Sequence, residues 1–295
     1  MGTTEIIFLL LTPATYCCML AVERRRLGRE FPPRRGWQWI GLAFLLVSIG
    51  IGNALPLFLP LDWLAEHRWY DGTRLGVIGG AVVGFVLIEL AVYVWHRSAH
   101  AFAPMWRVFH QIHHSPQRVD IPGALLFHPL ETVAYTLISL FITVIVIGLD
   151  PLAAAIAGYL FNFYALFQHW NIRTPQWLGY FIQRPESHCE HHRMGVHYFN
   201  FSDLPLWDIV FGTFRNPKEY VGECGFEGGR DRRLTAMLAF QDVNSTPYGP
   251  GSRGVRPASE PSEDPARRAS TEPGADGLPG TQPFTRRRDT PSTIS

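Results

Sequence analysis

The stretch Trp95–Ser115, WHRSAHAFAPMWRVFHQIHHS, holds five of the chain's twelve histidines and follows directly on a long apolar run. Residues three and four apart share one face of a helix, so histidines at that spacing direct their rings to one side. Neutral imidazole is the commonest side-chain ligand of metal ions. The pattern therefore predicts a polyhistidine metal site at a membrane surface. Three sets have this spacing: His96 and His100; His110, His113 and His114; His188, His191 and His192.

Composition indicates a membrane protein. Of 295 residues, 47% are hydrophobic and only 17% are charged, and the apolar residues come in long blocks. No basic stripe suggests nucleic acid. Each of five blocks is near the ~20 residues that cross a bilayer core. We therefore expect an all-α integral membrane bundle of about four to five helices, drawn from residues 6–22, 37–60, 75–95, 130–148 and 152–169.

Charge gives the expected orientation. Six arginines lie between the first and second blocks, in the segment 23–36, and the positive-inside rule assigns this loop to the cytoplasm. Two further crossings bring His96 and His100 to the cytoplasmic side as well. Since Lys218 is the only lysine among many arginines, we expect the inner membrane of a bacterium with a GC-rich genome.

The fourth and fifth blocks predict a hairpin that turns at residues 148–151. At 1.5 Å per residue, His128 lies about 30 Å down one arm and His169 about 27 Å down the other. Both then return to the level of the histidine-rich stretch. We expect His169 and His128 to join the ligands, although either residue alone also fits a hydrogen-bonded or capping histidine at the interface.

Three regions follow from these patterns. Residues 1–74 form N-terminal membrane helices and loops, and residues 75–243 form the histidine-bearing domain, whose part after residue 172 folds as a cytoplasmic cap. Residues 244–295 are rich in Pro, Gly, Ser, Thr and Arg and have almost no large apolar side chains. Such a segment cannot offset the entropy of folding, so we expect a disordered tail.

Four polar residues are candidates for orienting the imidazoles by accepting a hydrogen bond from the ring nitrogen that does not bind metal: Glu89, Glu131, Asn171 and Asp208. Glu89 lies seven residues before His96 inside an apolar block, where an ionisable group is costly unless it faces a polar interior. For Glu89 the alternative is an interhelical hydrogen bond. For Asp208 and Asn171 it is a purely structural cap.

The number of histidines predicts two metal ions, because nine or more imidazoles exceed what one ion of ordinary coordination number uses. A site rich in imidazole and poor in carboxylate favours a transition metal over magnesium or calcium. Iron, zinc, copper and manganese all remain possible, but the zinc-hydrolase motif HExxH is absent. The alternatives to a redox enzyme are a zinc-dependent membrane hydrolase or isomerase and a non-catalytic metal- or lipid-binding membrane protein.

The motifs HRSAH, FHQIHH, HPLE, QHWNI, ESHCEHH and LWDIVFGTF follow one another between about Glu89 and Arg215. In this order they resemble the fatty acid hydroxylase superfamily, also called the sterol desaturase family. The resemblance implies a catalytic domain over residues 75–243. It also implies a non-haem di-iron enzyme that uses O2 to hydroxylate or desaturate a lipid such as a sterol or fatty acyl chain.

The resemblance further implies two iron ions and a separate electron donor, either ferredoxin-like or cytochrome b5-like. No catalytic side chain beyond the metal ligands is implied. Carried over by position, the ligands are His96, His100, His110, His113, His114, His188, His191 and His192, with His169 from the region where relatives supply further histidines. His128, in HPLE, matches a family position, and we include it in the expected ligand set.

Overall fold

A computed structural model describes residues 3–244, and the side chains from residue 6 onward. Within this part of the chain every regular element is a helix, which confirms the all-α prediction. The predicted tail lies, from residue 245 on, outside the described residues. The helices are α1 (Thr3–Glu23), α2 (Trp37–Ala54), α3 (Leu61–Glu66), α4 (Gly76–Ala101), α5 (Ala103–Met105), α6 (Gln111–His114), α7 (Pro129–Leu140), α8 (Pro151–Gln168), α9 (Pro185–His191), α10 (Pro205–Val210) and α11 (Leu234–Leu238).

Short turns extend several of these helices. Two are π-helical, Trp106–His110 before α6 and Phe141–Val146 after α7. The others are 3-10 turns at Leu55–Phe58, Gly72–Leu75, Ile121–Gly123, Gln176–Tyr180 and Arg230–Arg232.

Five helical segments of the described chain are long and apolar enough to cross a membrane, as the sequence predicted. Large apolar side chains face outward on them, with Ile78 81% and Phe58 82% exposed, as expected for contact with lipid. The third segment continues six residues past its predicted end, because the HRSAH motif prolongs the helix. The segments are Ile6–Glu23, Trp37–Phe58, Gly72–Ala101, Pro129–Val146 and Pro151–Gln168.

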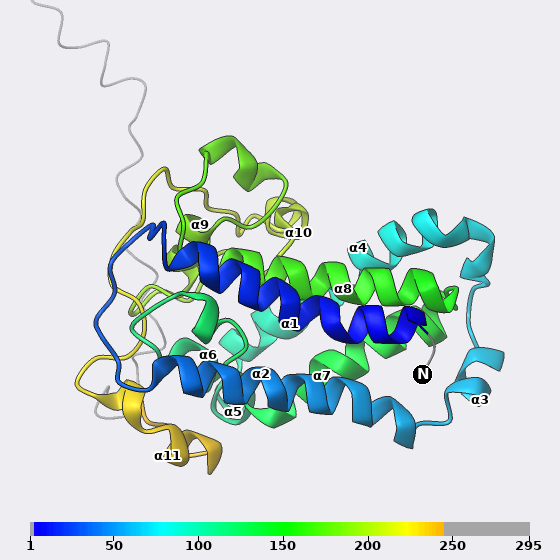
Figure 1. The fold of residues 1–295 in the computed structure, drawn as a ribbon, viewed down its shortest axis with the longest axis horizontal. Coiled ribbons are helices and arrows are strands. Elements are labelled where there is room, and N and C mark those ends of the chain that lie inside the picture. The colour runs from blue at the N-terminus through cyan, green and yellow to red at the C-terminus, as the bar shows by residue number, and fades with distance from the viewer. Residues whose placement is uncertain (1–2, 245–295) are drawn as a thin grey trace, which may run out of the picture. The chain divides into compact units, whose positions relative to one another are not determined.

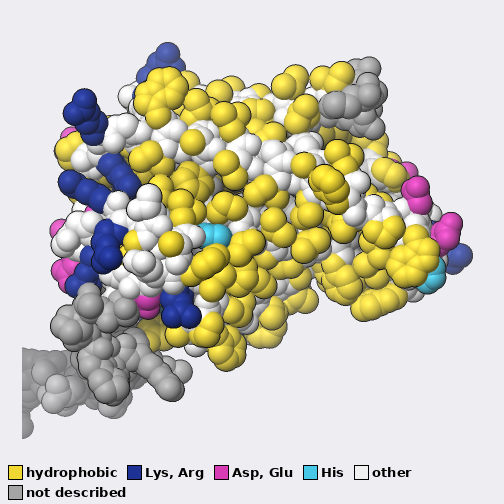
Figure 2. All heavy atoms as spheres, turned by 90° about the horizontal axis from the view of Figure 1, so that it is seen from below, with side chains coloured by type: hydrophobic (Ala, Val, Ile, Leu, Met, Phe, Trp, Pro, Cys, Tyr) yellow, Lys and Arg dark blue, Asp and Glu magenta, His cyan; other side chains and the backbone are white. Residues whose placement is uncertain are grey.

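The two ends of the helical bundle differ in charge. The long helices α1, α2 and α8 run beside one another, with α6, α9 and α11 at one end and α3 at the other (Figure 1). Lys and Arg side chains gather at the end that carries α9 and α11, while hydrophobic side chains cover the flank between the ends (Figure 2). The Arg-rich loop 23–36 and the histidine-rich segments therefore lie on the same side of the membrane.

Small residues allow α4 and α8 to pack closely. A Cβ atom on Gly84 would lie 2.6 Å from Leu149 Cδ1, and one on Gly80 would lie 3.1 Å from Ala153 Cβ. Close contact through small residues is the usual way in which membrane helices associate. The packing fixes the position of α4, whose C-terminal end carries the first two histidines of the site.

Buried polar contacts tie the ends of α1 and α2 to the segment that follows α6. The Glu23 carboxylate accepts hydrogen bonds from the backbone N–H groups of Ile121 and Asn171, both at 3.0 Å. The Trp37 indole donates to Asp120 Oδ1 at 2.9 Å. These bonds hold the start of α2, the end of α1 and the segment after α8 at one level.

The segment after residue 172 lies over the ends of the helices and also reaches down beside them. The Trp207 indole of α10 donates to the backbone carbonyl of Val86 at 3.1 Å. Val86 precedes His96 by ten residues, about 15 Å along α4. Part of the cap region therefore packs against a spanning helix inside the bilayer depth.

Candidate metal centre

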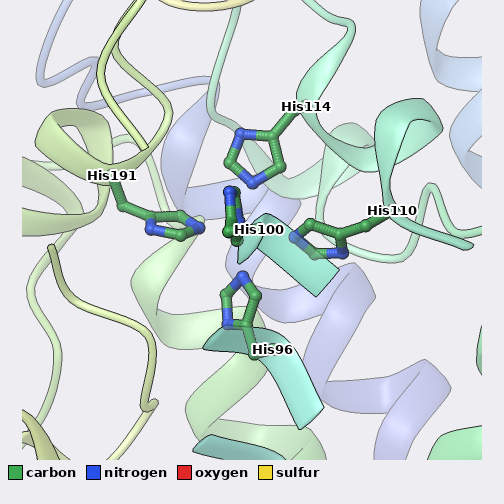
Figure 3. A group of neighbouring side chains, drawn as sticks. All are labelled: His96, His100, His110, His114 and His191. Atoms are coloured by element: carbon green, nitrogen blue, oxygen red, sulfur yellow. The ribbon is translucent and has the colours of Figure 1, made fainter. Parts of the chain in front are cut away.

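The structure gathers nine of the ten predicted ligands into two adjacent groups. In each group, one nitrogen from every ring lies within 4.8 Å of those of the other rings. In the first group, rings from the end of α4, from the α6 region and from α9 point toward one another (Figure 3). This group comprises His96, His100, His110, His114 and His191, and the second comprises His113, His169, His188 and His192.

Hydrogen bonds at the back of the first group set the direction of three rings. Each acceptor requires a proton on Nδ1, which leaves the lone pair on Nε2 facing the centre. Those three Nε2 atoms are buried and have no hydrogen-bond partner among the described residues. Metal-binding histidines are held in this way. The Nδ1 bonds run from His96 to the Phe201 carbonyl at 2.6 Å, from His110 to the Glu131 carboxylate at 2.7 Å and from His191 to the Phe199 carbonyl at 2.7 Å.

The second group brings ring nitrogens together at ligand spacing. His188 Nε2 lies 3.0 Å from the Nε2 atoms of both His169 and His192, and His169 Nε2 lies 3.3 Å from His113 Nε2. Metal–nitrogen bonds of about 2.1 Å place two ligands about 3.0 Å apart at a right angle and about 3.4 Å apart at a tetrahedral angle. The second group therefore fits a metal ion.

Burial keeps the rings neutral, as ligation requires. It lowers the pKa of His110 and the pKa of His169 to about 3. Burial and the neighbouring imidazoles also hold the pKa values of His188 and His192 well below the usual range. With all rings neutral, each offers a lone pair rather than a repelling positive charge.

The two groups share a boundary. The rings of His114 and His192, one from each group, stack with centroids 4.1 Å apart. Because His188, His191 and His192 all come from α9 and its end, a single short helix supplies both groups. Two ions held here would be close neighbours.

Buried polar residues fix the position of α9. The Arg184 guanidinium, fully buried at its start, donates to the carbonyls of Thr174 and Pro217 and forms an ion pair with Glu186 at 3.1 Å. Asn200 has a φ of 60°, in the left-handed region, and its amide donates to the Ser187 carbonyl at 2.8 Å. These contacts hold the third histidine motif over the end of α4.

Among the four candidates for orienting residues, Glu131 alone contacts a ring of the two groups. Asp208 acts one step further away: its carboxylate accepts from the N–H groups of Phe201 and Ser202, at 2.9 and 2.8 Å, and the Phe201 carbonyl in turn holds His96. Glu89 accepts from the Ser202 hydroxyl at 3.1 Å. It therefore supports the same loop rather than a ring.

Asn171 has a structural role. Its side chain makes hydrogen bonds of 2.9 and 2.8 Å with the backbone N–H and carbonyl of Arg29, and thereby secures the Arg-rich loop. It touches none of the clustered histidines in the described structure.

His128 corrects the predicted ligand set. It precedes Pro129 at the start of α7, and its Nδ1 accepts a hydrogen bond from the Leu130 N–H at 3.1 Å, which caps the helix. The lone pair that a metal would need is thus already used, and the ring belongs to neither group. The capping alternative is the one that the structure shows.

His197 is a neighbour of the site that the sequence analysis missed. Its ring stacks on His100 at 5.4 Å and lies 5.1 Å from the ring of Trp106. Burial lowers the pKa of His197 to about 4. A lone histidine five residues after the third motif has no helical partner, so spacing alone gave no signal.

A cavity of about 840 Å³ adjoins both groups. Side chains of α1, α2, α7 and α8 line it, and its site end is formed by His96, His110, His113 and His169, together with Gln168 and Asp203. A molecule in this cavity reaches the histidines from within the membrane part of the protein.

The fold and the site define a multi-pass membrane protein with a polyhistidine cluster able to hold metal. Residues 81–213 match the family model for fatty acid hydroxylase. This region, which contains all nine clustered histidines, is similar to the fatty acid hydroxylase superfamily.

Two kinds of curated protein are similar to the chain. The chain is 28% identical over 207 residues to the ornithine lipid hydroxylase OlsE of Rhizobium tropici, a match that covers 65% of this chain and 60% of the relative. It is 27% identical over 174 residues to the alkylglycerol monooxygenase of Homo sapiens, covering 55% of this chain and 34% of the relative. The Danio rerio alkylglycerol monooxygenase is 26% identical over 175 residues. No solved structure shows a significant match.

Proposed function

We propose that this protein is a membrane di-iron oxygenase that uses O2 and two external electrons to hydroxylate a C–H bond of a lipid. The carrying observation is the pair of adjacent histidine groups, with five and four inward-facing rings, at the end of a cavity that extends into the membrane part. The balance is one lipid C–H, O2, two electrons and two protons in, and one alcohol and one water out.

The residues present fit two transition-metal ions. One ion would be held by the first group, His96, His100, His110, His114 and His191, and the other by the second group, His113, His169, His188 and His192. Iron, when bound, supplies the capacity to activate O2 for oxidation of a C–H bond. Nine neutral imidazoles suit iron better than the four ligands of a structural zinc site.

The protein's own part is to place the lipid and to exclude water. Leu125, Phe127 and Ala165 give the site end of the cavity an apolar wall beside His113. Such a wall positions one segment of a chain against the histidines while keeping bulk water away. Glu131 holds the His110 ring in a fixed tautomer throughout.

The relatives' names support hydroxylation over desaturation. Those reported above are named for hydroxylase or monooxygenase reactions, and one is named for a lipid with an amino-acid head group. We infer that the substrate here is a membrane lipid. A lipid product that has lost two hydrogens and gained a double bond would instead indicate desaturation.

We place the site on the cytoplasmic side of a bacterial inner membrane, on the strength of the Arg-rich loop at the same end of the bundle. Electrons would come from a separate ferredoxin-like or cytochrome b5-like protein. An acidic donor of either kind is complementary to the arginines at this end.

Lipid analysis tests the proposal. Lipids from cells that express the protein should contain a species with one added oxygen, which is absent from cells without it and labelled when ¹⁸O2 is supplied. His113→Ala and His191→Ala each remove one ligand, one from each group, and should abolish this species at unchanged protein level. Product formation that survives both changes would mean that the assigned site is wrong.

A further inference from the structure

The length of the cavity beside the histidines is close to the thickness of the hydrocarbon core of a bilayer. It is lined at one end by His169, directly after α8, and at the other by Asp150 and Pro151, where α8 begins. Those ends are 18 residues apart, about 27 Å at 1.5 Å per residue, against ~30 Å for the hydrocarbon core of a bilayer. An extended chain lying in the cavity would therefore run parallel to the helices.

Seven hydroxyl-bearing side chains line this cavity. Thr132, Tyr135 and Thr136 of α7 lie nearer the site, and the other four lie near the middle, one each on α1, α2, α7 and α8. Counted from the residue at the site end of its helix, each lies ten or eleven positions away, or about 15–17 Å. The hydroxyls, named here the hydroxyl collar, are those of Thr12 (α1, from Glu23), Ser48 (α2, from Trp37), Ser139 (α7, from His128) and Tyr159 (α8, from His169).

Hydrogen bonds connect three of these starting points at one level, and a ring contact connects the fourth to the site. Glu23 accepts from the N–H of Asn171, two residues past His169, and from that of Ile121. Trp37 donates to Asp120, the residue before Ile121. The ring of Phe127, next to His128, stacks on His113 at 4.4 Å. The collar therefore surrounds the cavity at a single depth near the middle of the membrane.

Three members of the collar lack hydrogen-bond partners in the described part of the chain. Tyr159 is bonded to the Thr15 hydroxyl at 2.9 Å, but no bond is made by the hydroxyls of Thr12, Ser48 or Ser139. Three other polar side chains behave differently: Thr136 of α7, Thr143 of the π-helical turn after it and Asn162 of α8 each donate to a backbone carbonyl four residues earlier, at 2.8–2.9 Å. Thr132, nearer the site, resembles the collar in making no side-chain hydrogen bond within the described residues. A hydroxyl left without a partner in an apolar environment is unfavourable, so the collar is suited to a ligand that supplies one.

The surroundings decide the chemistry of that ligand. The charged residues that line the cavity, Asp150 and Asp203, lie at its two ends and not at the collar. A phosphate or ammonium group at mid-depth would have no counter-charge there, whereas a neutral group needs none. Apolar side chains line the cavity on either side of the collar, such as Phe127 toward the site and Leu152 away from it. Among the polar side chains between the collar and the site, Tyr135, Thr136 and Asn162 are already hydrogen-bonded within the protein.

We propose that the hydroxyl collar binds a neutral hydrogen-bonding group, a hydroxyl, ester or amide, placed within an otherwise apolar lipid about 15 Å from the carbon that is oxidised. This inference rests on the proposed function, because the reacting carbon is placed by the histidines. The collar selects lipids in which the polar group and the reacting carbon have this separation, and it sets which carbon meets the site.

Binding without turnover tests the collar separately. The probes are two chain-matched lipids, one with an amide about 15 Å from its terminal carbon and one with methylene groups in its place. Each displaces a fluorescent fatty acid from the metal-loaded protein in nanodiscs under anaerobic conditions. Variants Ser48→Ala/Ser139→Ala and Tyr159→Phe remove collar oxygens. Thr143→Val is the matched control, because its hydroxyl lies on the same helical segment but bonds to the Ser139 carbonyl and does not line the cavity.

The wild-type protein and the Thr143→Val variant should bind the amide probe roughly tenfold more tightly than the methylene probe, the effect of one to two hydrogen bonds. The Ser48→Ala/Ser139→Ala variant should lose this preference and keep its affinity for the methylene probe, which also shows that it is folded. Tyr159→Phe should lose part of the preference. Equal binding of the two probes by the wild-type protein, or an unchanged preference in the double variant, would overturn the collar.

The two proposals fail in different ways. A tenfold preference with no oxygenated lipid in cells leaves the collar standing and refutes the oxygenase. Oxygenated lipid without any preference between the probes leaves the oxygenase standing and refutes the collar.

Discussion

At the scale of single residues, the contact between Glu131 and His110 is the arrangement expected of a metal-binding histidine. The carboxylate accepts from His110 Nδ1 at 2.7 Å, and both side chains are almost completely buried. A buried imidazole that is fixed from behind presents its other nitrogen in one direction only. The site is thus organised before any ion arrives.

Replacing Glu131 by alanine should weaken metal retention roughly 10- to 100-fold, the usual effect of losing such a partner. The measurement is the metal remaining per chain during titration with a chelator. Glu131→Gln keeps an oxygen that can accept from His110 and should lose much less. Tyr135→Phe removes the other group bonded to the same carboxylate, at 3.2 Å, without touching a ring, and serves as the control. Wild-type retention in Glu131→Ala would contradict this role.

Most of the clustered histidines could be predicted from the sequence because helical spacing states which rings share a face. Spacing cannot show which hydrogen bonds the two ring nitrogens of each histidine make. His128 stands before a proline at a helix start, and only the structure reveals that its lone pair caps the helix. The carbonyls of Phe199 and Phe201 were likewise invisible, since backbone acceptors carry no sequence signal.

At the scale of helices, the contact between α4 and α8 holds the first pair of histidines in place. Gly80 and Gly84 face Ala153, Ala157 and Leu149 of the neighbouring segment, with no space for larger side chains. A shift of α4 would move His96 and His100 away from the rings that α6 and α9 supply. Close packing of α4 and α8 is therefore a condition for the clustering of these histidines.

Gly84→Leu should destabilise the protein by about 1–3 kcal/mol, because the added side chain overpacks this contact. The expected result is a lower midpoint of thermal unfolding in detergent, together with reduced metal content. Gly79→Leu is the control, since a Cβ there would meet only Leu75 Cβ, at 3.6 Å. Equal midpoints for the two variants would show that the α4–α8 contact is not limiting.

The existence of the five long helices could be predicted because each is an apolar run near membrane thickness. Their ends were less accurate. The second helix breaks at Ala54 into a 3-10 turn that contains Pro56, and the fourth widens into a π-helical turn from Phe141. Neither departure changes hydropathy, which was the basis of the prediction.

At the scale of the whole described molecule, the two ends of the bundle are chemically distinct. The site end carries the Arg-rich loop, whereas the opposite loops balance Arg68 and Arg74 against Asp71, with ion pairs of 3.5 and 3.4 Å. This asymmetry is the physical basis for the proposed orientation. The cavity and its collar were not predictable, because they depend on how four helices face one another.

Single cysteines at the exposed positions Arg35 and Asp62 should report opposite sides of the membrane. Cys17 and Cys18 are first replaced by alanine, while the buried Cys189 and Cys224 stay in place. A membrane-impermeant maleimide should label Asp62→Cys in spheroplasts and Arg35→Cys in inside-out vesicles. The reverse pattern would place the site on the outer face and remove the basis for a cytoplasmic electron donor.

The number of iron ions per chain tests the central claim most directly. Protein purified anaerobically from iron-replete cells should contain two irons per chain, and His114→Ala and His169→Ala, which each damage one group, should contain fewer. Zinc as the sole metal, or one iron per chain that is unaffected by either change, would contradict a di-iron centre built from these two groups.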